Sequence, residues 1–525
     1  MNFDHSILSI ITFIPLAGAV LLALLPDRGK LIPGVALVVT LVTFLATLHL
    51  PAHFNYSAPA GSFQFAVDVP WVASPAIHYH LGVDGLSMWL IVLSGLLAPL
   101  GVLISWNSIA ERKKLFYTLF LLQQVAMMGI FVSLDLFVYY AFWELSLVPM
   151  TILIATFGRT ENRRRAAIKY FLYAFIPSAV LLVGILWLYV TTGTFDVVQL
   201  TGLAAAHGIS PNTAALWLVS LSFLGAFAVK VPVFPLHGWL VDAISEAPTA
   251  AVMVLVGKLG LYSILRFSFG IFPDQSREIA PLLIALGAIG IVYGALLALV
   301  QKDMKKLAAF GTLGHVSVVV LGIFTFTIAG IDGGIYQTIN EGLGGAALFM
   351  LLGLLYERYG TYDLREFGGL AQQLPWVVTF FVITTLSVVG LPMLNGFVGE
   401  FLVFSGAMQS GVTHHVGFTV LATTGVILTA AYMLTMVQKI FYGSLGLKPR
   451  TVPPRDLDAR EHLLLWPVAV LMLAMGLASP YWMRAIDTVG AAIADDIPSS
   501  PATPAVYMVP GSNFPQHAYQ DGGQK

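Results

Sequence analysis

This sequence predicts an all-α polytopic membrane protein with about 14 transmembrane helices, two inverted five-helix repeats and two discontinuous helices. Three observations support the prediction: an apolar composition, a regular series of apolar runs, and two runs too long for one straight helix. Hydrophobic residues make up 58% of the 525 residues and charged residues 10%, with a mean hydropathy of +0.84. Soluble domains carry about 25% charged residues. The composition therefore excludes a soluble globular protein.

Apolar runs of about 20 residues, the length that crosses a bilayer, recur along the chain. The first lacks a basic region before it and a small-residue cleavage site after it, which indicates a retained span and not a signal peptide. The expected spans lie at about 6–25, 31–50, 85–106, 115–133, 135–157, 167–191, 213–246, 249–269, 279–300, 304–329, 334–356, 375–410, 417–442 and 462–482.

Two of these runs, 213–246 and 375–410, exceed the length of one span and contain Pro and Gly interruptions. Proline removes a backbone donor and breaks a helix, which is tolerated at membrane depth only where protein or water covers the freed carbonyls. We therefore expect these two runs to be the discontinuous helices.

The two broken runs occupy corresponding places in two blocks of five spans. A unit with an odd number of crossings reappears upside down, as in the inverted repeats of many ion transporters. The predicted divisions are the first three helices at 1–110, the first repeat at 111–270, the second repeat at 271–445, and a last helix with an outward-facing tail at 446–525.

The basic residues gather in alternate loops, so they fall on one face of the membrane. By the positive-inside rule this face is cytoplasmic, and both termini, the 51–81 loop and a poorly ordered tail after Asp487 face outward. The expected location is a bacterial-type inner (plasma) membrane. The residues on the basic face are Arg28, Lys30, Arg112, Lys113, Lys114, Arg159, Arg163, Arg164, Arg165, Lys169, Lys302, Lys305, Lys306, Arg358, Arg365, Lys439, Lys448, Arg450, Arg455 and Arg460.

Several ionisable residues lie inside the apolar runs, where a charge costs roughly 2.5–3.5 kcal/mol even on insertion scales. Lys230 precedes Pro232, and Glu144 lies roughly 16 Å beyond the start of its span at 1.5 Å per residue. A carboxylate beside an ammonium keeps both charged, and separating them moves a proton. The alternative is a static ion pair that joins two helices.

The row of buried groups continues through Lys258, His315, Glu341 and Glu400. Lys258 could instead extend to a membrane surface, and His315 could be a hydrogen-bonded core residue. Glu341 could simply neutralise Lys258. Together with the first pair, these residues predict a path for protons.

Other functional classes have little support in the sequence. Cysteine is absent, which excludes disulfides, Cys-based catalysis and thiolate-ligated iron–sulfur clusters. No phosphate-binding loop, catalytic triad or nucleic-acid-binding patch occurs. The exterior pairs His78/His80 and His414/His415 lack further ligands, so no metal site is expected.

Seven segments together resemble the antiporter-like membrane subunits of respiratory complex I, over about residues 80–445. The chain length, the lack of a long C-terminal extension and a glutamate at position 400 are most similar to the M-type subunits. The segments are GVDGLS (82–87), FWELSLVPM (142–150), VKVPVFPLHGWLVDAISEAPT (229–249), KLG (258–260), QKDMKKLAAFGTLGHVS (301–317), QTINEGLGGAALF (337–349) and GLPMLNGFVGEF (390–401).

The resemblance implies a proton-translocating subunit of NADH–quinone oxidoreductase. Glu144 and Lys230 would form the pair on the input side of a proton channel. Lys258 would connect the two parts of the channel, His315 would relay protons, and Glu400 would serve the exit. Lys169 and His237 are candidate modulators. The chain itself would hold no cofactor, because NAD, FMN, iron–sulfur clusters and quinone would belong to partner subunits, both membrane and peripheral. Lipid and protons complete the expected partners, and nucleic acid is not among them.

The chain departs from the family pattern at Glu341, where histidine is usual. A variant relay, a divergent subfamily or a different coupling ion would each account for the change. Two other functions remain open on the sequence alone: a subunit of a multi-subunit Na⁺/H⁺ antiporter or membrane-bound hydrogenase, and a structural or quinone-lining subunit with inert buried charges.

Overall fold

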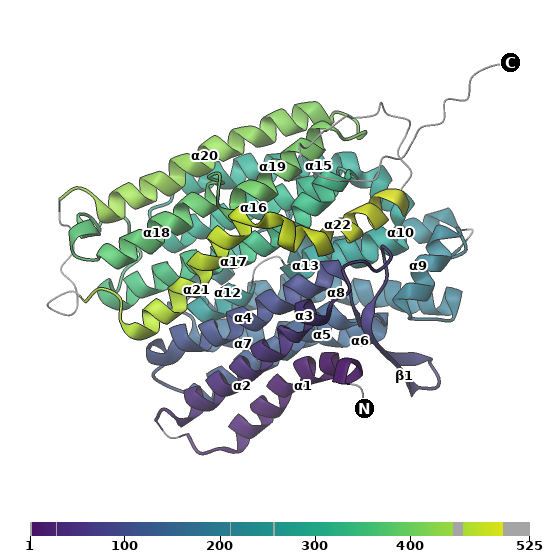
Figure 1. The fold of residues 1–525 in the computed structure, drawn as a ribbon, viewed down its shortest axis with the longest axis horizontal. Coiled ribbons are helices and arrows are strands. Elements are labelled where there is room, and N and C mark those ends of the chain that lie inside the picture. Colours follow the sequence, from purple (N-terminus) through teal and green to yellow (C-terminus); the bar gives the residue numbers. More distant parts are fainter. Residues whose placement is uncertain (1–2, 28, 211, 256–257, 445–454, 497–525) are drawn as a thin grey trace.

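The computed structural model describes residues 3–27, 29–210, 212–255, 258–444 and 455–496 (Figure 1). Within these residues, thirteen helices are long and apolar enough to cross a membrane. Two shorter apolar helices in the 375–410 run together account for the fourteenth predicted span. The all-α polytopic prediction is confirmed. Arg28, Lys448, Arg450 and the last part of the predicted tail lie outside the described residues.

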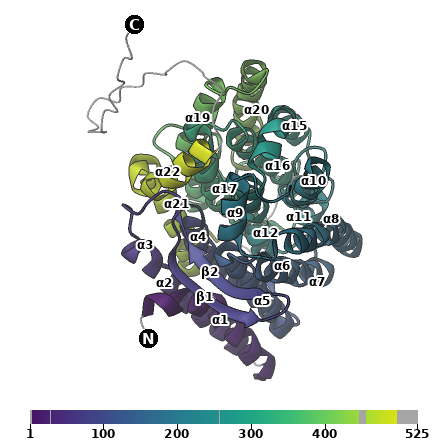
Figure 2. The same cartoon turned by 90° about the vertical axis from the view of Figure 1, so that its right-hand side faces the viewer.

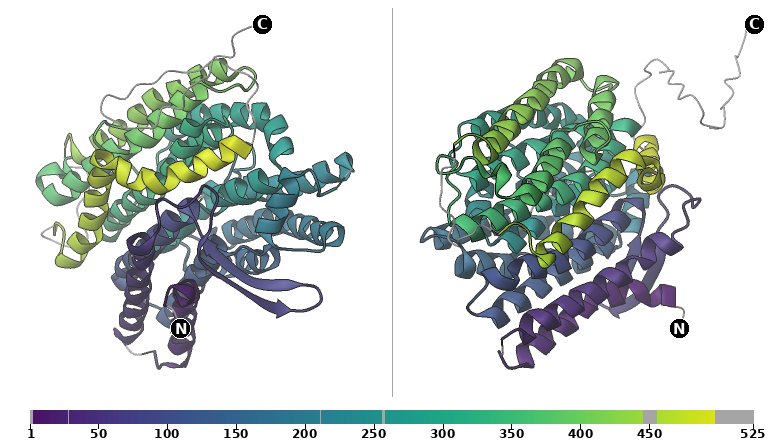
Figure 3. Two further views of the ribbon diagram at one scale, coloured as in Figure 1. Left: turned by 45° about the vertical axis from the view of Figure 1, so that its right-hand side comes forward. Right: turned by 60° about the vertical axis from the view of Figure 1, so that its left-hand side comes forward.

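The N-terminal part consists of three long helices and a two-stranded antiparallel sheet. Figure 3 shows the first two helices as an antiparallel pair along one edge of the bundle. The elements are α1 (Phe3–Leu24), α2 (Leu31–Thr47), α3 (His49–His53), β1 (Gln64–Val72), β2 (Ile77–Val83) and α4 (Gly85–Ser108).

The hairpin of β1 and β2 occupies the stretch that the sequence predicted only as a loop. An isolated two-stranded hairpin is at best marginally stable, so its contacts with the helices matter. The His80 carbonyl accepts a hydrogen bond from the Leu134 amide at 2.9 Å, and the Asp135 carboxylate accepts one from the His78 amide at 3.0 Å. The hairpin is therefore fixed to the beginning of the next span.

The chain continues from α5 to α14, and one span in this part bends at Ser146 between two shorter helices. The elements of this part are α5 (Lys113–Val132), α6 (Leu136–Leu145), α7 (Leu147–Phe157), α8 (Arg163–Thr192), α9 (Val197–Ala205), α10 (Thr213–Lys230), α11 (Leu240–Glu246), α12 (Thr249–Leu255), α13 (Lys258–Ser263), the π-helical turn η1 (Ile264–Ser268) and α14 (Phe269–Ile271).

The next part of the chain runs from α15 to α20 and is followed by the last span and a terminal helix. Its elements are α15 (Pro273–Leu299), α16 (Met304–Ile323), α17 (Ile328–Tyr359), the 3₁₀ turn η2 (Leu370–Gln372), α18 (Pro375–Val388), α19 (Asn395–Met408) and α20 (His415–Phe441). The final helices are α21 (Ala459–Leu477) and α22 (Ser479–Asp496). The tail predicted after Asp487 is therefore helical as far as Asp496, because its apolar face packs against α4 and α17.

Both predicted helix breaks are present. The first separates α10 from α11, and the indole of Trp239 donates to the Val229 carbonyl at 2.9 Å, while the Val233 amide donates to Ala228 at 2.9 Å. Carbonyls at the end of α10 are thus satisfied without water. This is the condition under which an interrupted helix is tolerated inside a membrane.

The second break separates α18 from α19 and is closed by amide side chains. The Asn340 amide group donates to the Asn395 carbonyl at 2.8 Å, and the Asn395 side chain donates back to Asn340 Oδ1 at 2.9 Å. Ser387 also donates to Asn395 Oδ1 at 2.6 Å. Gly390 turns the chain here with φ +78°, a conformation that glycine adopts without strain.

A third irregularity was not predicted. The run at 249–269, expected as one straight span, contains the π-helical turn η1, in which Arg266 is placed against Asp84 with a 2.5 Å ion pair. Close packing of Gly260 against Phe227 and Val231 brings α13 onto the end of α10. The two regions that carry Lys230 and Lys258 are therefore neighbours.

The two ends of the helix bundle carry different loops and short elements. One end, here called the hairpin face, carries β1, β2, α3, α9 and α22, and Figure 2 shows these elements nearest the viewer. The opposite end, the basic face, carries the loops that contain most of the described basic residues of the predicted cytoplasmic face. This alternation agrees with the loop pattern predicted from sequence.

Candidate functional site: a row of buried ionisable residues

The predicted site residues lie on six different helices. Each is placed beside a helix break, a small residue or a polar neighbour, and four of the six are almost fully buried, with exposures of 3–8%. The positions are Glu144 on α6, Lys230 at the end of α10, Lys258 at the start of α13, His315 on α16, Glu341 on α17 and Glu400 on α19.

Glu144 and Lys230 are near each other but not in direct contact. The hydroxyl of Ser178 donates a short hydrogen bond to the Glu144 carboxylate. Among the described residues, no ion pair joins Glu144 to Lys230, although the carboxylate acts electrostatically on the ammonium. The geometry is that of a separated pair, in which each charged group has another polar partner.

The Lys230 ammonium occupies an aromatic and hydroxyl-lined pocket. It donates to the Tyr170 hydroxyl at 3.2 Å and to the Ser146 hydroxyl at 3.4 Å. It also lies 5.5 Å from the centres of the Trp143 and Tyr170 rings. Cation–π contacts stabilise a desolvated ammonium, so Lys230 can remain buried without a carboxylate in contact.

The two candidate modulators lie toward the basic face from this pair. Lys169 forms a 2.7 Å ion pair with Asp242 of α11, so its partner is this carboxylate and not Glu144. His237 lies in the α10–α11 break, packed against Phe234 and Tyr293. Its Nδ1 is buried and has no hydrogen-bond partner among the described residues.

Lys258 approaches α17 where that helix has a glycine. Its ammonium donates to the Met253 carbonyl at 3.2 Å, and its side chain lies against Gly342. A methyl group at Gly342 would touch the lysine side chain. The neighbouring Glu341 is the acidic group that acts electrostatically on Lys258. The carboxylate that the local sequence of Lys258 lacks is therefore supplied by α17.

His315 links α16 to two other helices. Its Nδ1 lies 3.7 Å from the Glu400 carboxylate, and its Nε2 lies 3.3 Å from the Tyr432 hydroxyl. A cavity of about 10 Å³, close to the volume that one water requires, is lined by His315, Glu341, Thr312 and Tyr432. A single water at this position would connect His315 and Glu341.

The six residues form two groups that meet where α10 and α13 pack together. The first group contains Glu144 and Lys230, and the second contains Lys258, Glu341, His315 and Glu400. No electron carrier is needed to move charge along such a row. Proton transfer requires only water and a difference in proton affinity between neighbouring groups.

Sequence reasoning missed several buried ionisable residues, among them Lys305 and Asp332. Lys305, assigned to the basic loops, is 4% exposed, and its ammonium donates to the Ala247 carbonyl at 2.5 Å. Asp332 is 4% exposed within α17. The rule that identified Glu341, a charge inside an apolar run, would also have identified Asp332. Tyr170, Ser178 and Tyr432 carried no such signal, because their roles arise from packing.

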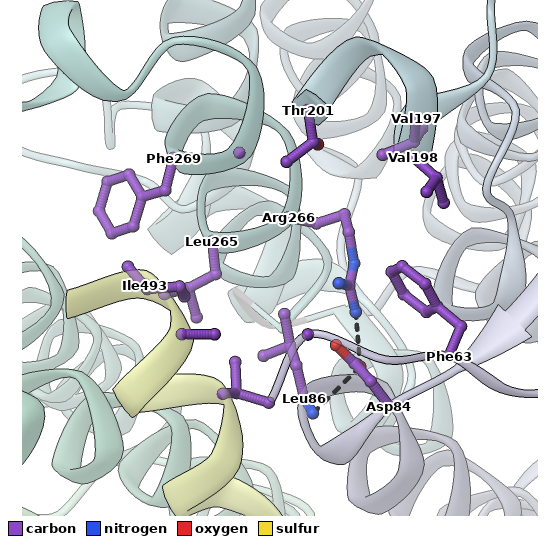
Figure 4. Close-up of a pocket in the computed structure, with 14 residues that line it drawn as sticks. Phe63, Asp84, Leu86, Val197, Val198, Thr201, Leu265, Arg266, Phe269 and Ile493 are labelled. Carbon is purple, nitrogen blue, oxygen red and sulfur yellow. Dashed lines mark hydrogen bonds and ion pairs between the residues drawn. The ribbon is translucent and has the colours of Figure 1, made fainter. Parts of the chain in front are cut away.

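A cavity of about 150 Å³ on the hairpin face contains none of the six residues (Figure 4). Arg266 extends into it, held by Asp84 and by ring contacts with Phe63 and Tyr262. Residues of α9 and α22, among them Val197 and Ile493, form its other walls. Its lining is apolar apart from Thr201 and the ion pair of Arg266 with Asp84, so it holds no series of separate ionisable groups like that of the row.

The hairpin face also holds a titratable pair outside the spans, His80 and Asp196, joined by a short hydrogen bond. Burial alone would lower the pKa of His80, but the hydrogen bond and charge of Asp196 outweigh it, so the pKa is raised. Burial alone would raise the pKa of Asp196, but hydrogen bonds from His80 and from the Gln199 amide lower it. This pair connects β2 to the start of α9.

Two family models match the chain. The one described as NADH:quinone oxidoreductase/Mrp antiporter, TM, matches residues 133–428. The one described as NADH-ubiquinone oxidoreductase chain 4, amino terminus, matches residues 29–134. The first contains all six residues of the row.

Similar proteins extend over almost the whole chain. The NADH-quinone oxidoreductase subunit M of Rhodobacter capsulatus is 37% identical over 93% of this chain and 96% of its own, and the NADH-ubiquinone oxidoreductase chain 4 of Marchantia polymorpha is 33% identical over 92% and 96%. A chain of respiratory complex I from Thermus thermophilus superimposes with a TM-score of 0.84, at 30% identity, over 94% of this chain and all of its own. A chain of the Mrp complex from Dietzia sp. shares the fold, with a TM-score of 0.82 at 23% identity over 94% and 98%. The chain therefore belongs to the family of NADH:quinone oxidoreductase and Mrp antiporter membrane subunits.

Proposed function

We propose that this chain is a proton-translocating membrane subunit of an NADH–quinone oxidoreductase, complex I. The observation that carries the proposal is the row of six ionisable side chains inside the bundle, which passes both helix breaks. Charges without a function would add a large desolvation free energy inside a membrane. They are also rare in the packing of membrane helices, which uses mainly small residues. The relatives at 30% identity or more that are described above carry NADH–quinone or NADH–ubiquinone oxidoreductase names, which favours this function over an independent antiporter or a hydrogenase subunit.

The proposed path begins at Glu144 and Lys230. When the Glu144 carboxylate approaches Lys230, the lysine would bind its proton more tightly. When Glu144 moves back toward Ser178, the proton would pass from Lys230 to Lys258. From Lys258 the proton passes to Glu341, through the water-sized cavity to His315, and on to Glu400 at 3.7 Å. The separated Glu144–Lys230 geometry supports the releasing arrangement of this cycle.

The driving reaction belongs to other subunits. We assign NADH oxidation, FMN, the iron–sulfur clusters and quinone to partner subunits of the complex, both membrane and peripheral, and assign only proton movement to this chain. The positive-inside rule places the basic face in the cytoplasm and the hairpin face outside. Protons then move from the cytoplasm outward across a bacterial-type inner membrane.

Co-purification tests the assignment to the complex. The tagged chain, isolated in mild detergent, should bring with it NADH-oxidising flavin and iron–sulfur subunits. Recovery with hydrogenase or antiporter subunits would contradict the proposal.

Charge removal tests the path. Lys230→Met and Glu144→Gln should each reduce proton uptake by complex-containing vesicles several-fold. A rate-limiting general acid–base step accelerates a reaction about 10²–10⁴-fold, and we expect the loss here to be part of that range. Both variants should assemble, since a buried helix tolerates loss of a charge better than gain of one. Lys439→Met, which removes an exposed lysine of α20, is the matched control. Normal uptake in both assembled variants would refute the coupling role.

A further inference from the structure

Asp332 is a buried carboxyl group that the path described above does not use. It lies on α17 near the hairpin face, only 4% exposed. Its Oδ1 has no hydrogen-bond partner, and its carboxylate has no ion-pair partner, among the described residues. An unpaired buried carboxylate is strongly disfavoured, so Asp332 is expected to hold a proton in this arrangement. Ionisable residues inside a membrane bundle mark ion pathways by default.

Helix α22 lies directly over Asp332. At Gly490 its backbone is so close to the Asp332 carboxyl that a methyl group there would overlap with the acid. The helix is held in place at Trp482, whose carbonyl accepts a hydrogen bond from the Trp89 indole at 3.2 Å. The adjacent part of α22 also lines the 150 Å³ cavity of the hairpin face (Figure 4). Asp332 is thus separated from the exterior by one helix.

That helix carries a second acid one turn from Gly490. Asp487 is exposed, and it acts electrostatically on Asp332. Residues three apart lie on the same side of a helix, so Asp487 and Gly490 both face the Asp332 region. A proton leaving Asp332 therefore has an acceptor in contact with outside water.

Polar side chains extend from the proposed row toward Asp332. Gln337 and Asn340 are hydrogen-bonded at 2.9 Å and lie between Asp332 and Glu341 along α17. Gln337 Oε1 also packs against Gly399, the neighbour of Glu400. Five residues of helix, roughly 7.5 Å, separate Asp332 from Gln337. Amides do not shuttle protons, but they orient the water that does.

We propose that Asp332 is the proton-release site at the outer end of the path: it takes a proton from Glu400 through water ordered by Gln337 and Asn340, and delivers it to Asp487. The step moves one proton between carboxyl groups, with no other reactant. This inference rests on the proposed function of the row. Helix α22 then covers the outer end of the proton path.

The test uses the intact complex in proteoliposomes and three variants. Asp332→Asn keeps the shape but cannot release a proton, so proton uptake should fall about three- to tenfold, a part of the range of a general acid–base step. Asp332→Glu keeps the carboxyl and should retain most of the rate. Asp274→Asn, which removes an exposed acid on the same face, should have no effect. Equal rates for Asp332→Asn and wild type would overturn the inference, as would equal losses in the Asn and Glu variants, which indicate a packing role.

Lys230→Met measured in parallel separates the two proposals. If Lys230→Met impairs pumping and Asp332→Asn does not, only the release site is refuted. If neither variant impairs pumping, the proposed function itself fails. A second measurement does not depend on activity: because the chain has no native cysteine, Asp332→Cys should react with a small water-soluble maleimide added from the hairpin face. Failure to react at all would show that no water route reaches position 332.

Discussion

Glu341 and Lys258 show how a residue gains its role from a neighbour far away in sequence. Lys258 has no acid near it along the chain, and α17 supplies Glu341 beside Gly342. Glutamate has a reference pKa near 4.3, against about 6.5 for histidine. The ability of a glutamate to bind and release protons near neutral pH therefore depends on its surroundings more than that of a histidine does. Substitutions at position 341 therefore test directly whether this residue relays protons.

Substitutions at Glu341 should follow the requirement for a titratable group. Glu341→His is expected to preserve much of the proton uptake, because imidazole titrates near neutrality. Glu341→Ala should reduce uptake several-fold, since it leaves no titratable group between Lys258 and His315. The measurement is proton uptake per NADH oxidised in vesicles. If Glu341→Gln pumps like wild type and Glu341→His is the worse variant, Glu341 only neutralises Lys258 and is not a relay.

At the scale of elements, the hairpin of β1 and β2 is attached by an ion pair in addition to its hydrogen bonds with Leu134 and Asp135. The pair of His80 and Asp196 joins it to α9, whereas His78 and Asp68, at 2.7 Å, form an exposed pair within the hairpin. Exposed pairs contribute little, about 0–1 kcal/mol, and charge-assisted hydrogen bonds in protected positions contribute about 1.5–3 kcal/mol. Of the two ion pairs, that of His80 should therefore contribute more to stability.

This attachment should depend on pH. The pKa of His80 is raised above 6.5, so its contribution is complete below pH 6.5 and is lost as pH rises through the raised value. The pKa of Asp196 is lowered below 3.8, so its contribution is complete above pH 3.8 and is lost as pH falls through the lowered value. Hydrogen exchange of the hairpin amides, corrected for intrinsic rates, should be slowest between these limits and faster at alkaline pH.

Two histidine variants make this measurement specific. His80→Gln should remove most of the pH dependence and accelerate exchange at pH 6, while His78→Gln should leave both nearly unchanged. An unchanged profile in His80→Gln would contradict the proposed attachment.

The α18–α19 break depends on a buried set of amide hydrogen bonds. Asn395→Leu should leave Asn340 and Ser387 without their partners, at about 1–3 kcal/mol for each unsatisfied group. We expect a lower melting temperature of the purified complex and less assembled complex. Gln409→Leu, which changes an exposed amide at the end of the same helix, should leave both near wild type. Equal stability of the two variants would show that the amide set is not required for the break.

At the scale of the whole molecule, the two faces differ in charge, which predicts a single orientation. The absence of native cysteine makes labelling straightforward. Ser57→Cys on the hairpin face should react with an impermeant maleimide in intact cells, and Glu161→Cys on the basic face should react only after the membrane is opened. The reverse pattern would invert the direction of proton movement proposed here.

Much of this molecule follows from the sequence alone. The number and placement of spans come from apolar run length, because the hydrocarbon thickness fixes how many residues a helix needs. Pro232 and Pro235 predict the first break, since proline cannot complete the helix hydrogen bonds. Glu144, Lys230, Lys258, His315, Glu341 and Glu400 are identifiable as charges or a histidine within apolar runs, because desolvation makes such residues costly to retain.

Other features were decided only by tertiary structure. The 51–81 segment forms a hairpin because Leu134 and Asp135, between α5 and α6, supply its hydrogen-bond partners. The local sequence of the segment does not predict contacts with residues so far along the chain. The separation of Glu144 from Lys230 follows from competition by Ser178 and Tyr170, which approach from α8. The last part of α22 forms where the sequence predicted a poorly ordered tail after Asp487, because a short helix becomes stable when α4 and α17 bury its apolar face. Sequence therefore determined which charges enter the membrane, and packing determined which of them meet.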